Sequence, residues 1–304
     1  MFEKIVSAFT STNRNNRIFQ ALVFLAIIFI AIFFYKKSYA PTGVEGFSQS
    51  DRYILRENSQ IYDDFYSQIY DKLMHPTQKS EYFVSKIIEM TQPNKTYSAF
   101  LDIGSGTGAL VDKLKKSGYK AYGIDKSKAM VDQSKILYPD IPVKCEDVQN
   151  PITYDRGSFT HILCTGKTIY ELTDKPQFFK NAYFWLQGNG YLILELVDRS
   201  ALESSCNLST KNTNSETNVT DTLVDFLDFS YRSSFRFKDD GKTVIHKEIF
   251  TDTVTKNIRE NEKVLEIEEP NEIIKLATNT GFIIKGKTSM DRPGEYLYIL
   301  ERVN

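Results

Sequence analysis

Short apolar runs alternate with amphipathic segments through the middle of the chain. The runs have the length and the β-branched and aromatic content of buried strands, and apolar residues recur at helical spacing between them. The predicted strands are Ser98–Ile103, Tyr119–Asp125, a third strand that ends just before Asp147, Phe159–Cys164 and Gly190–Val197. The predicted helices are Asn58–Leu73, Lys79–Met90, Leu110–Lys116, Ser127–Leu137 and Lys175–Leu186. This alternation predicts an α/β fold, with a parallel sheet covered by helices on both faces.

The pattern changes after Val197. Residues 199–229 include a stretch rich in Ser, Thr and Asn, which predicts a mobile loop and connection. Residues 230–266 contain three β-rich runs with the turn sequence Asp239-Asp240-Gly241, which predicts an inserted antiparallel β subdomain. Residues 267–304 contain one helical segment and two strands, so we expect the chain to return to the first sheet there.

The N-terminal region contains an apolar segment, residues 18–35, in which Gln20 is the only polar residue. Its length is about the minimum for a membrane-spanning helix, and Lys36-Lys37 follows it directly. A cleaved signal peptide is one alternative, because Ser38-Tyr39-Ala40 resembles a cleavage site, although the following Pro41 disfavours cleavage. A buried globular helix is the other, but its apolar residues would need burial on every face. We therefore expect a polar tail at 1–17, a transmembrane helix at 18–35 and a linker at 36–57.

The sequence at 100–110 is the most informative part of the chain. A predicted strand ends at Asp102-Ile103, glycines follow at 104, 106 and 108, and a helix begins next. Such a turn lets a ligand contact bare backbone at the N-terminus of a helix. The spacing also fits the loose dinucleotide-binding pattern, so by itself it indicates only a nucleotide-like ligand.

Acidic residues at the ends of three successive strands narrow the choice of ligand. Asp102 would repel a pyrophosphate but suits a cationic ligand. Asp125 ends the second strand, about 20 residues after the glycines, where an α/β unit places a carboxylate on ribose hydroxyls. Asp147 follows the third strand. We expect all three carboxylates on one edge of the sheet.

With these residues, positions 60–198 resemble the class I S-adenosylmethionine-dependent methyltransferases. The resemblance implies a Rossmann-like, seven-stranded sheet and S-adenosylmethionine as cofactor. It also implies that Asp102 and the glycines hold the methionine part, Asp125 the ribose and Asp147 the adenine amino group. The implied cofactor-binding residues are Asp102, Gly104, Ser105, Gly106, Gly108, Asp125, Lys126, Asp147, Val148 and Thr165. The β insertion after strand five looks like the arrangement in small-molecule N-methyltransferases.

Composition and the remaining motifs limit the class of molecule that could accept the methyl group. The 304-residue chain has a formal net charge of −1, which does not favour nucleic-acid binding. The loop after strand four lacks the Pro-containing motifs of DNA methyltransferases. The cysteines show no metal or disulfide spacing, so we expect no metal and a reducing compartment. Since S-adenosylmethionine is made in the cytosol, we expect the large domain to face it; charge alone does not set the orientation.

Few residues are candidates for the acceptor chemistry. Methyl transfer needs positioning, and a base only if the nucleophile carries a proton. We select Tyr170 and Glu171 in the loop after strand four, and His246 on the inserted sheet, as candidate catalytic residues. Tyr62, Tyr66 and Tyr70 share one helical face and form either a cofactor lid or a packing stripe.

The sequence thus predicts a membrane-anchored methyltransferase with a small or membrane-proximal acceptor and no nucleic-acid partner. Two alternatives stay open. A scaffold protein with a methyltransferase-like fold would bind the cofactor without transferring a methyl group. An NAD-dependent Rossmann oxidoreductase would bind NAD instead, which Asp102 disfavours.

Overall fold

The computed structural model describes residues 51–201, 219–226, 228–292 and 294–303, with the side chains of 219–225 left out. The predicted tail at 1–17, the predicted transmembrane helix at 18–35 and most of the predicted linker lie outside these residues. Within the described part of the chain, no helix combines the length and the apolar character needed to cross a bilayer.

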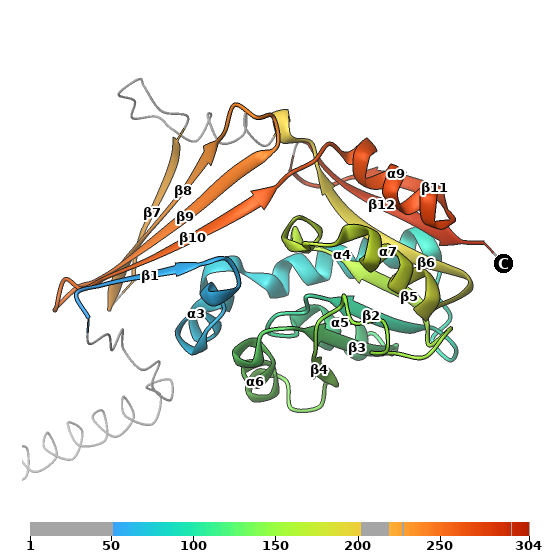
Figure 1. The fold of residues 1–304 in the computed structure, drawn as a ribbon. Coiled ribbons are helices and arrows are strands. Elements are labelled where there is room, and N and C mark those ends of the chain that lie inside the picture. Colours follow the sequence, from blue (N-terminus) through green and yellow to red (C-terminus); the bar gives the residue numbers. More distant parts are fainter. Residues whose placement is uncertain (1–50, 202–218, 227, 293, 304) are drawn as a thin grey trace, which may run out of the picture. The chain divides into compact units, whose positions relative to one another are not determined.

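A seven-stranded, mostly parallel sheet forms the centre of the fold (Figure 1). Its order is β11-β12-β6-β5-β2-β3-β4. The strands are β2 (Ala99–Ile103), β3 (Lys120–Asp125), β4 (Val143–Cys145), β5 (Phe159–Cys164), β6 (Leu186–Val197), β11 (Phe282–Ser289) and β12 (Glu295–Arg302). Only β12 runs antiparallel to its neighbours. The predicted seven-stranded α/β sheet is confirmed.

Helices cover both faces of this sheet. They are α4 (Pro76–Thr91), α5 (Ala109–Lys116), α6 (Lys128–Leu137), α7 (Lys175–Trp185) and α9 (Pro270–Thr280). Apolar residues of α4 and α5 pack with Leu163 and Ile193, whereas those of α7 and α9 pack with Ile162 and Leu192. Because neighbouring residues of a strand point to opposite faces, these two clusters are the two cores of the sheet.

The insertion contributes four strands to a second sheet of five, in the order β1-β10-β9-β8-β7. The strands of this sheet are β1 (Tyr53–Glu57), β7 (Val219–Asp225), β8 (Phe229–Phe237), β9 (Thr243–Asp252) and β10 (Ile258–Glu266). The four later strands pair antiparallel, as expected for the insertion.

Two predicted boundaries are wrong at this sheet. Residues 53–57, assigned to the linker at 36–57, form β1, which pairs in parallel with β10. Residues 219–225, assigned to the loop at 199–229, form β7, which pairs with β8. In both segments the backbone N–H and C=O groups are paired with a neighbouring strand. The partner of β1 is distant in the sequence, and the partner of β7 follows a turn that the sequence pattern did not reveal.

The N-terminal helical region has two parts where the sequence predicts one helix. A short 3-10 helix, η1 (Asn58–Ile61), precedes α3 (Asp64–Met74). Asp63 separates them because its side chain accepts a hydrogen bond from the backbone N–H of Tyr66, which caps α3. The same carboxylate pairs with Arg259 of β10 at 2.8 Å, so the inserted sheet fixes the start of α3.

Candidate active site

The glycine turn lies where β2 meets α5, as the sequence predicts. Gly104, Gly106 and Gly108 all have positive φ angles, of 65°, 54° and 87°. A Cβ atom at Gly108 would lie 2.3 Å from Ile141, so a side chain there would displace core atoms. At Gly106 the nearest atom to such a Cβ belongs to the Tyr70 ring, 3.8 Å away on the pocket side. The turn therefore presents bare backbone to the pocket, next to the N-terminus of α5.

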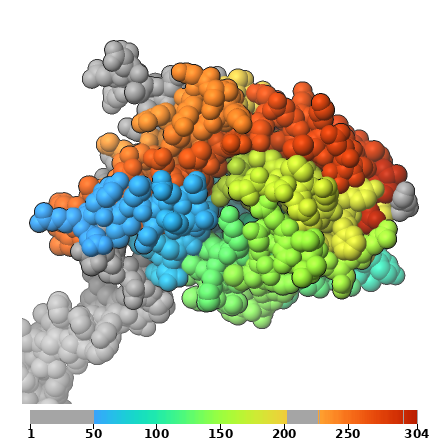
Figure 2. Space-filling model, in the orientation of Figure 1, coloured from blue at the N-terminus to red at the C-terminus, as the bar shows by residue number. Residues whose placement is uncertain are grey.

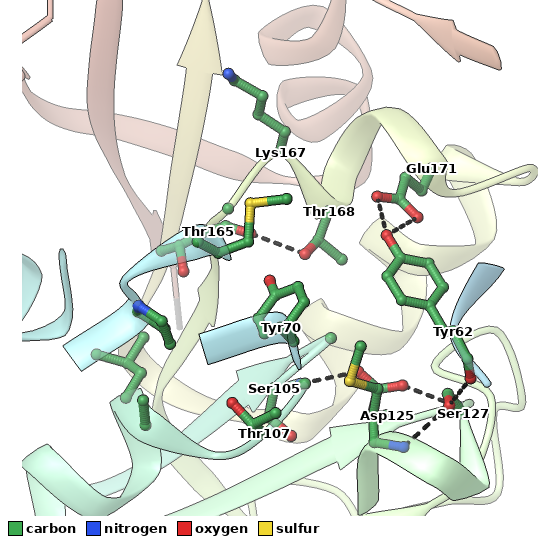
Figure 3. A pocket seen from close by; sticks show the side chains of 18 of the residues that line it. Tyr62, Tyr70, Ser105, Thr107, Asp125, Ser127, Thr165, Lys167, Thr168 and Glu171 are labelled. Carbon is green, nitrogen blue, oxygen red and sulfur yellow. Dashed lines mark hydrogen bonds between the residues drawn. The ribbon is translucent and has the colours of Figure 1, made fainter. Parts of the chain in front are cut away.

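Asp125 organises this turn from the end of β3. One carboxylate oxygen accepts the Gly106 N–H at 2.9 Å and the other accepts the Ser127 N–H at 2.8 Å (Figure 3). Burial raises the pKa of Asp125, and these two hydrogen bonds oppose the rise. Each oxygen keeps a lone pair for a further donor, such as a ribose hydroxyl.

Asp102 lies beside Asp125 on the neighbouring strand and is buried, with 4% of its surface exposed. Burial, followed by the charge of Asp125, raises the pKa of Asp102 well above its usual range. A cationic group bound beside these two carboxylates would lower this electrostatic cost. Two acids close together at a pocket floor thus suit a positively charged ligand.

Other predicted cofactor residues complete the same end of the pocket. Lys126, Asp147, Val148 and Thr165 all line it, together with Ser105. The Asp147 carboxylate accepts the Gln149 N–H at 2.8 Å, which holds the loop after β4 in place. The structure thus brings every predicted cofactor-binding residue except Gly108 to the pocket, and Gly108 caps the helix behind it. Their contacts with the cofactor stay a prediction.

The three N-terminal tyrosines lie over this site. The Tyr62 hydroxyl donates to the Glu171 carboxylate, with distances of 2.8 and 2.9 Å to its two oxygens (Figure 3). The Lys263 ammonium pairs with the same carboxylate at 3.0 Å. Tyr70 lines the pocket, and burial raises its pKa. Glu171 therefore links the segment between η1 and α3, the loop after β5 and the inserted sheet.

Tyr170 does not face the pocket, which corrects its selection as a candidate catalytic residue. Its side chain is 3% exposed, and its hydroxyl accepts a hydrogen bond from the Val197 N–H at 2.8 Å. Tyr170 and Glu171 are successive residues of the 3-10 helix η2 (Thr168–Glu171), so their side chains point in different directions. Tyr170 is therefore a packing residue that fixes the end of β6.

His246 lies on the face of β9 that lines the pocket. One ring nitrogen is 2.8 Å from the Ser233 hydroxyl, and the ring stacks on Phe235 with a centroid distance of 4.3 Å. Burial lowers the pKa of His246 to about 4, so the imidazole is neutral near pH 7. It is available as a hydrogen-bonding group, and its role in catalysis stays a prediction.

Sequence reasoning missed Glu195, which interrupts the apolar stretch of β6 and lines the pocket. Its carboxylate accepts the Gly166 N–H at 2.5 Å. Close by, Lys167 pairs with Glu295 at 3.5 Å. A charged residue near the carboxyl end of an otherwise apolar strand was the available signal.

A single large pocket joins these groups. Its volume is about 1390 Å³, and it extends from Asp147 past the glycine turn to Tyr231 and Phe235 on the inserted sheet. Figure 2 shows the blue N-terminal segment, the green segment around α6 and β4 and the yellow-green segment around η2 and α7 meeting around a hollow. The volume accommodates a nucleoside-sized ligand together with a second small molecule.

Comparisons with known proteins agree with this arrangement. Residues 101–194 match the family model described as a methyltransferase domain. A comparison with curated protein sequences gave no match. The crystal structure of an S-adenosylmethionine-dependent methyltransferase from Clostridium acetobutylicum is similar, with 18% identity and a TM-score of 0.60, covering 79% of this chain and 98% of that one.

Two further structures share the fold. The CcbJ methyltransferase of Streptomyces caelestis has 14% identity and a TM-score of 0.61, with 80% of this chain and 98% of that one covered. An amino pentose methyltransferase from Micromonospora echinaspora, solved with S-adenosylmethionine, has 17% identity and a TM-score of 0.56. The match covers 75% of this chain and 91% of that one. Residues 101–194 are therefore a methyltransferase domain, and the chain has the fold of S-adenosylmethionine-dependent methyltransferases.

Proposed function

We propose that the protein transfers the methyl group of S-adenosylmethionine to a small acceptor bound between the glycine turn and the inserted sheet. The observation that carries this proposal is the continuity of the pocket from Asp125 to Ser233 and His246. One end has the backbone and the acids suited to the cofactor, and the other end has polar and aromatic side chains suited to an organic acceptor.

The inserted sheet supports this proposal because it covers the acceptor end. Tyr231, Ser233 and Phe235 alternate along β8 and all line the pocket, as does Leu265 of β10. Such a cover excludes water and holds the acceptor near the sulfonium, which is the main contribution a protein makes to this reaction. The solved relative that is an amino pentose methyltransferase also supports an amine as the acceptor group.

Filling the acceptor end tests the proposal. In Ser233→Phe, the larger ring occupies the pocket beside His246, so we expect methyl transfer to fall about 100-fold while S-adenosylhomocysteine still binds. Methyl transfer is measured as radioactive methyl passed from S-adenosylmethionine to molecules of a small-molecule extract, and cofactor affinity is measured by calorimetry.

Ser234→Phe is the matched control, because Ser234 is half-buried on the opposite face of β8 and does not line the pocket. It is expected to leave both quantities near wild type. Full transfer by Ser233→Phe would place the acceptor elsewhere.

We also propose that residues 18–35 anchor the enzyme in a membrane with the catalytic domain facing the cytosol. The support is the apolar sequence of that segment and its position before β1. A chain lacking residues 1–50 retains every described element, since β1 begins at Tyr53. We expect the full chain in the membrane fraction, and the shortened chain in the supernatant with cofactor affinity intact. Full-length chain in the supernatant without detergent would refute the anchor.

A further inference from the structure

One buried acid of the pocket, Glu195, is neither among the predicted cofactor-binding residues nor among those that link the N-terminal segment to the inserted sheet. Glu195 is 6% exposed, and only one of its oxygens, Oε2, is occupied, by the Gly166 N–H at 2.5 Å. The other oxygen, Oε1, accepts no hydrogen bond from any residue that the structure describes. Since Glu195 lines the pocket, this oxygen is free for a ligand.

The strand register places Glu195 on the acceptor side of the cofactor end. Asp102 of β2 pairs with Leu163 of β5, and Leu163 pairs with Ile193 of β6. Glu195 lies two residues after Ile193, so its side chain is on the same face of the sheet as that of Ile193. Neighbouring strands are about 4.8 Å apart, so Asp102 and Glu195 are on the order of 10 Å apart across the sheet. That distance leaves space for a sulfonium and its methyl group between them.

The groups around the two acids agree with this placement. Cys164 ends β5, between β2 and β6, and its buried thiol has a pKa raised first by burial and then by the charges of Asp102 and Glu195. Around Glu195 itself, Lys167 provides a positive charge that opposes the effects of burial and of Glu295 on its pKa. The site thus holds a carboxylate with a nearby cation and one open oxygen.

We propose that Glu195 binds the acceptor through an amine N–H and takes the proton that this nitrogen loses, which makes the acceptor of this enzyme a small amine. The inference rests on the proposed methyl transfer in the same pocket. The nitrogen lone pair forms a bond to the methyl carbon while the carbon–sulfur bond breaks. The electron pair of the carbon–sulfur bond stays on sulfur, so the sulfonium becomes a neutral thioether and the nitrogen gains the positive charge. The nitrogen then gives one proton to Glu195 Oε1, and solvent removes it from there.

A buried carboxylate suits this reaction for an electrostatic reason. Positive charge moves from sulfur toward the nitrogen during transfer, so a negative group beside the nitrogen stabilises the transition state more than the ground state. The hydrogen bond that Oε1 accepts from the amine N–H also turns the nitrogen lone pair toward the methyl group. A hydroxyl acceptor would also lose a proton, but it is a weak nucleophile until that proton is removed, whereas a neutral amine attacks through its free lone pair, so a carboxylate is a sufficient base for the amine.

Two cofactor analogues test the proposal without knowledge of the acceptor. Sinefungin carries a carbon-bound amine where S-adenosylmethionine carries its methyl sulfonium, whereas S-adenosylhomocysteine has no group there. In the full chain with Glu195→Gln, we expect sinefungin to bind at least about tenfold more weakly and S-adenosylhomocysteine to bind as in wild type. Glutamine keeps the shape of the side chain and an oxygen for the Gly166 N–H.

Glu301→Gln is the matched control, because Glu301 lies on neighbouring β12, pairs with Lys285 and does not line the pocket. It is expected to change neither affinity. Equal weakening of both analogues in Glu195→Gln would mean that Glu195 supports the cofactor or the fold, and no weakening of either would mean that it faces no amine. Either result overturns the inference. If the wild-type chain bound neither analogue, the proposed function itself would fail.

Discussion

Replacing Asp125 by alanine is expected to weaken S-adenosylhomocysteine binding by about 1–3 kcal/mol, measured by calorimetry. Two losses combine in this variant. The ribose hydroxyls lose their proposed acceptor, and the N–H groups of Gly106 and Ser127 lose the carboxylate that positions the glycine turn. We expect the variant to fold, because Asp125 lies at the end of β3 and borders the pocket.

The control for this prediction is Asp112→Ala. Asp112 lies on α5, pairs with Lys116 and does not line the pocket, so its removal is expected to leave cofactor affinity unchanged. An unchanged affinity in Asp125→Ala would remove the ribose assignment and much of the argument from the glycine turn.

Glu248→Ala is expected to cost the protein about 3 kcal/mol of unfolding free energy. Glu248 is buried on β9 and accepts hydrogen bonds from Tyr66 at 3.0 Å, Tyr231 at 2.8 Å and Asn261 at 3.3 Å. Removing it leaves three buried donors without their acceptor. Because Tyr66 belongs to α3, the change also loosens the contact between the N-terminal helix and the inserted sheet. Urea denaturation with an unchanged slope measures the effect.

Glu266→Ala provides the comparison on the same sheet. Glu266 is exposed on β10 and lies 3.8 Å from Lys242, a surface pair of the kind that contributes less than about 1 kcal/mol. We expect its removal to leave stability almost unchanged. Similar losses in the two variants would show that the buried network around Glu248 adds nothing specific.

Much of the sheet was predictable from the sequence because its strands are buried on both faces. The runs Phe159–Cys164 and Gly190–Val197 are almost wholly apolar, and each lies between turn or helix signals. The strand β1 lacked such a signal. Its five residues alternate between exposed and half-buried positions, and its partner β10 is distant in the sequence. Only the folded chain supplies that pairing.

The cofactor end of the site was predictable for a related reason. Asp102, Asp125 and Asp147 follow strands, and parallel strands bring their carboxyl ends to one edge of the sheet. The acceptor end depends on side-chain direction instead. Tyr170 and Glu171 are adjacent in the sequence, yet Glu171 lines the pocket and Tyr170 points into the core. Glu195 was read as part of a strand core because its neighbours are apolar.

Paired calorimetric titrations of the full chain distinguish most directly between S-adenosylmethionine and a dinucleotide as the ligand of this pocket. Asp102 and Asp125 form an acidic floor that suits a sulfonium and opposes a pyrophosphate. We predict that S-adenosylhomocysteine binds with a stoichiometry of about one, as expected for one pocket, and that NAD gives no heat of binding. Binding of NAD without binding of S-adenosylhomocysteine would contradict this prediction.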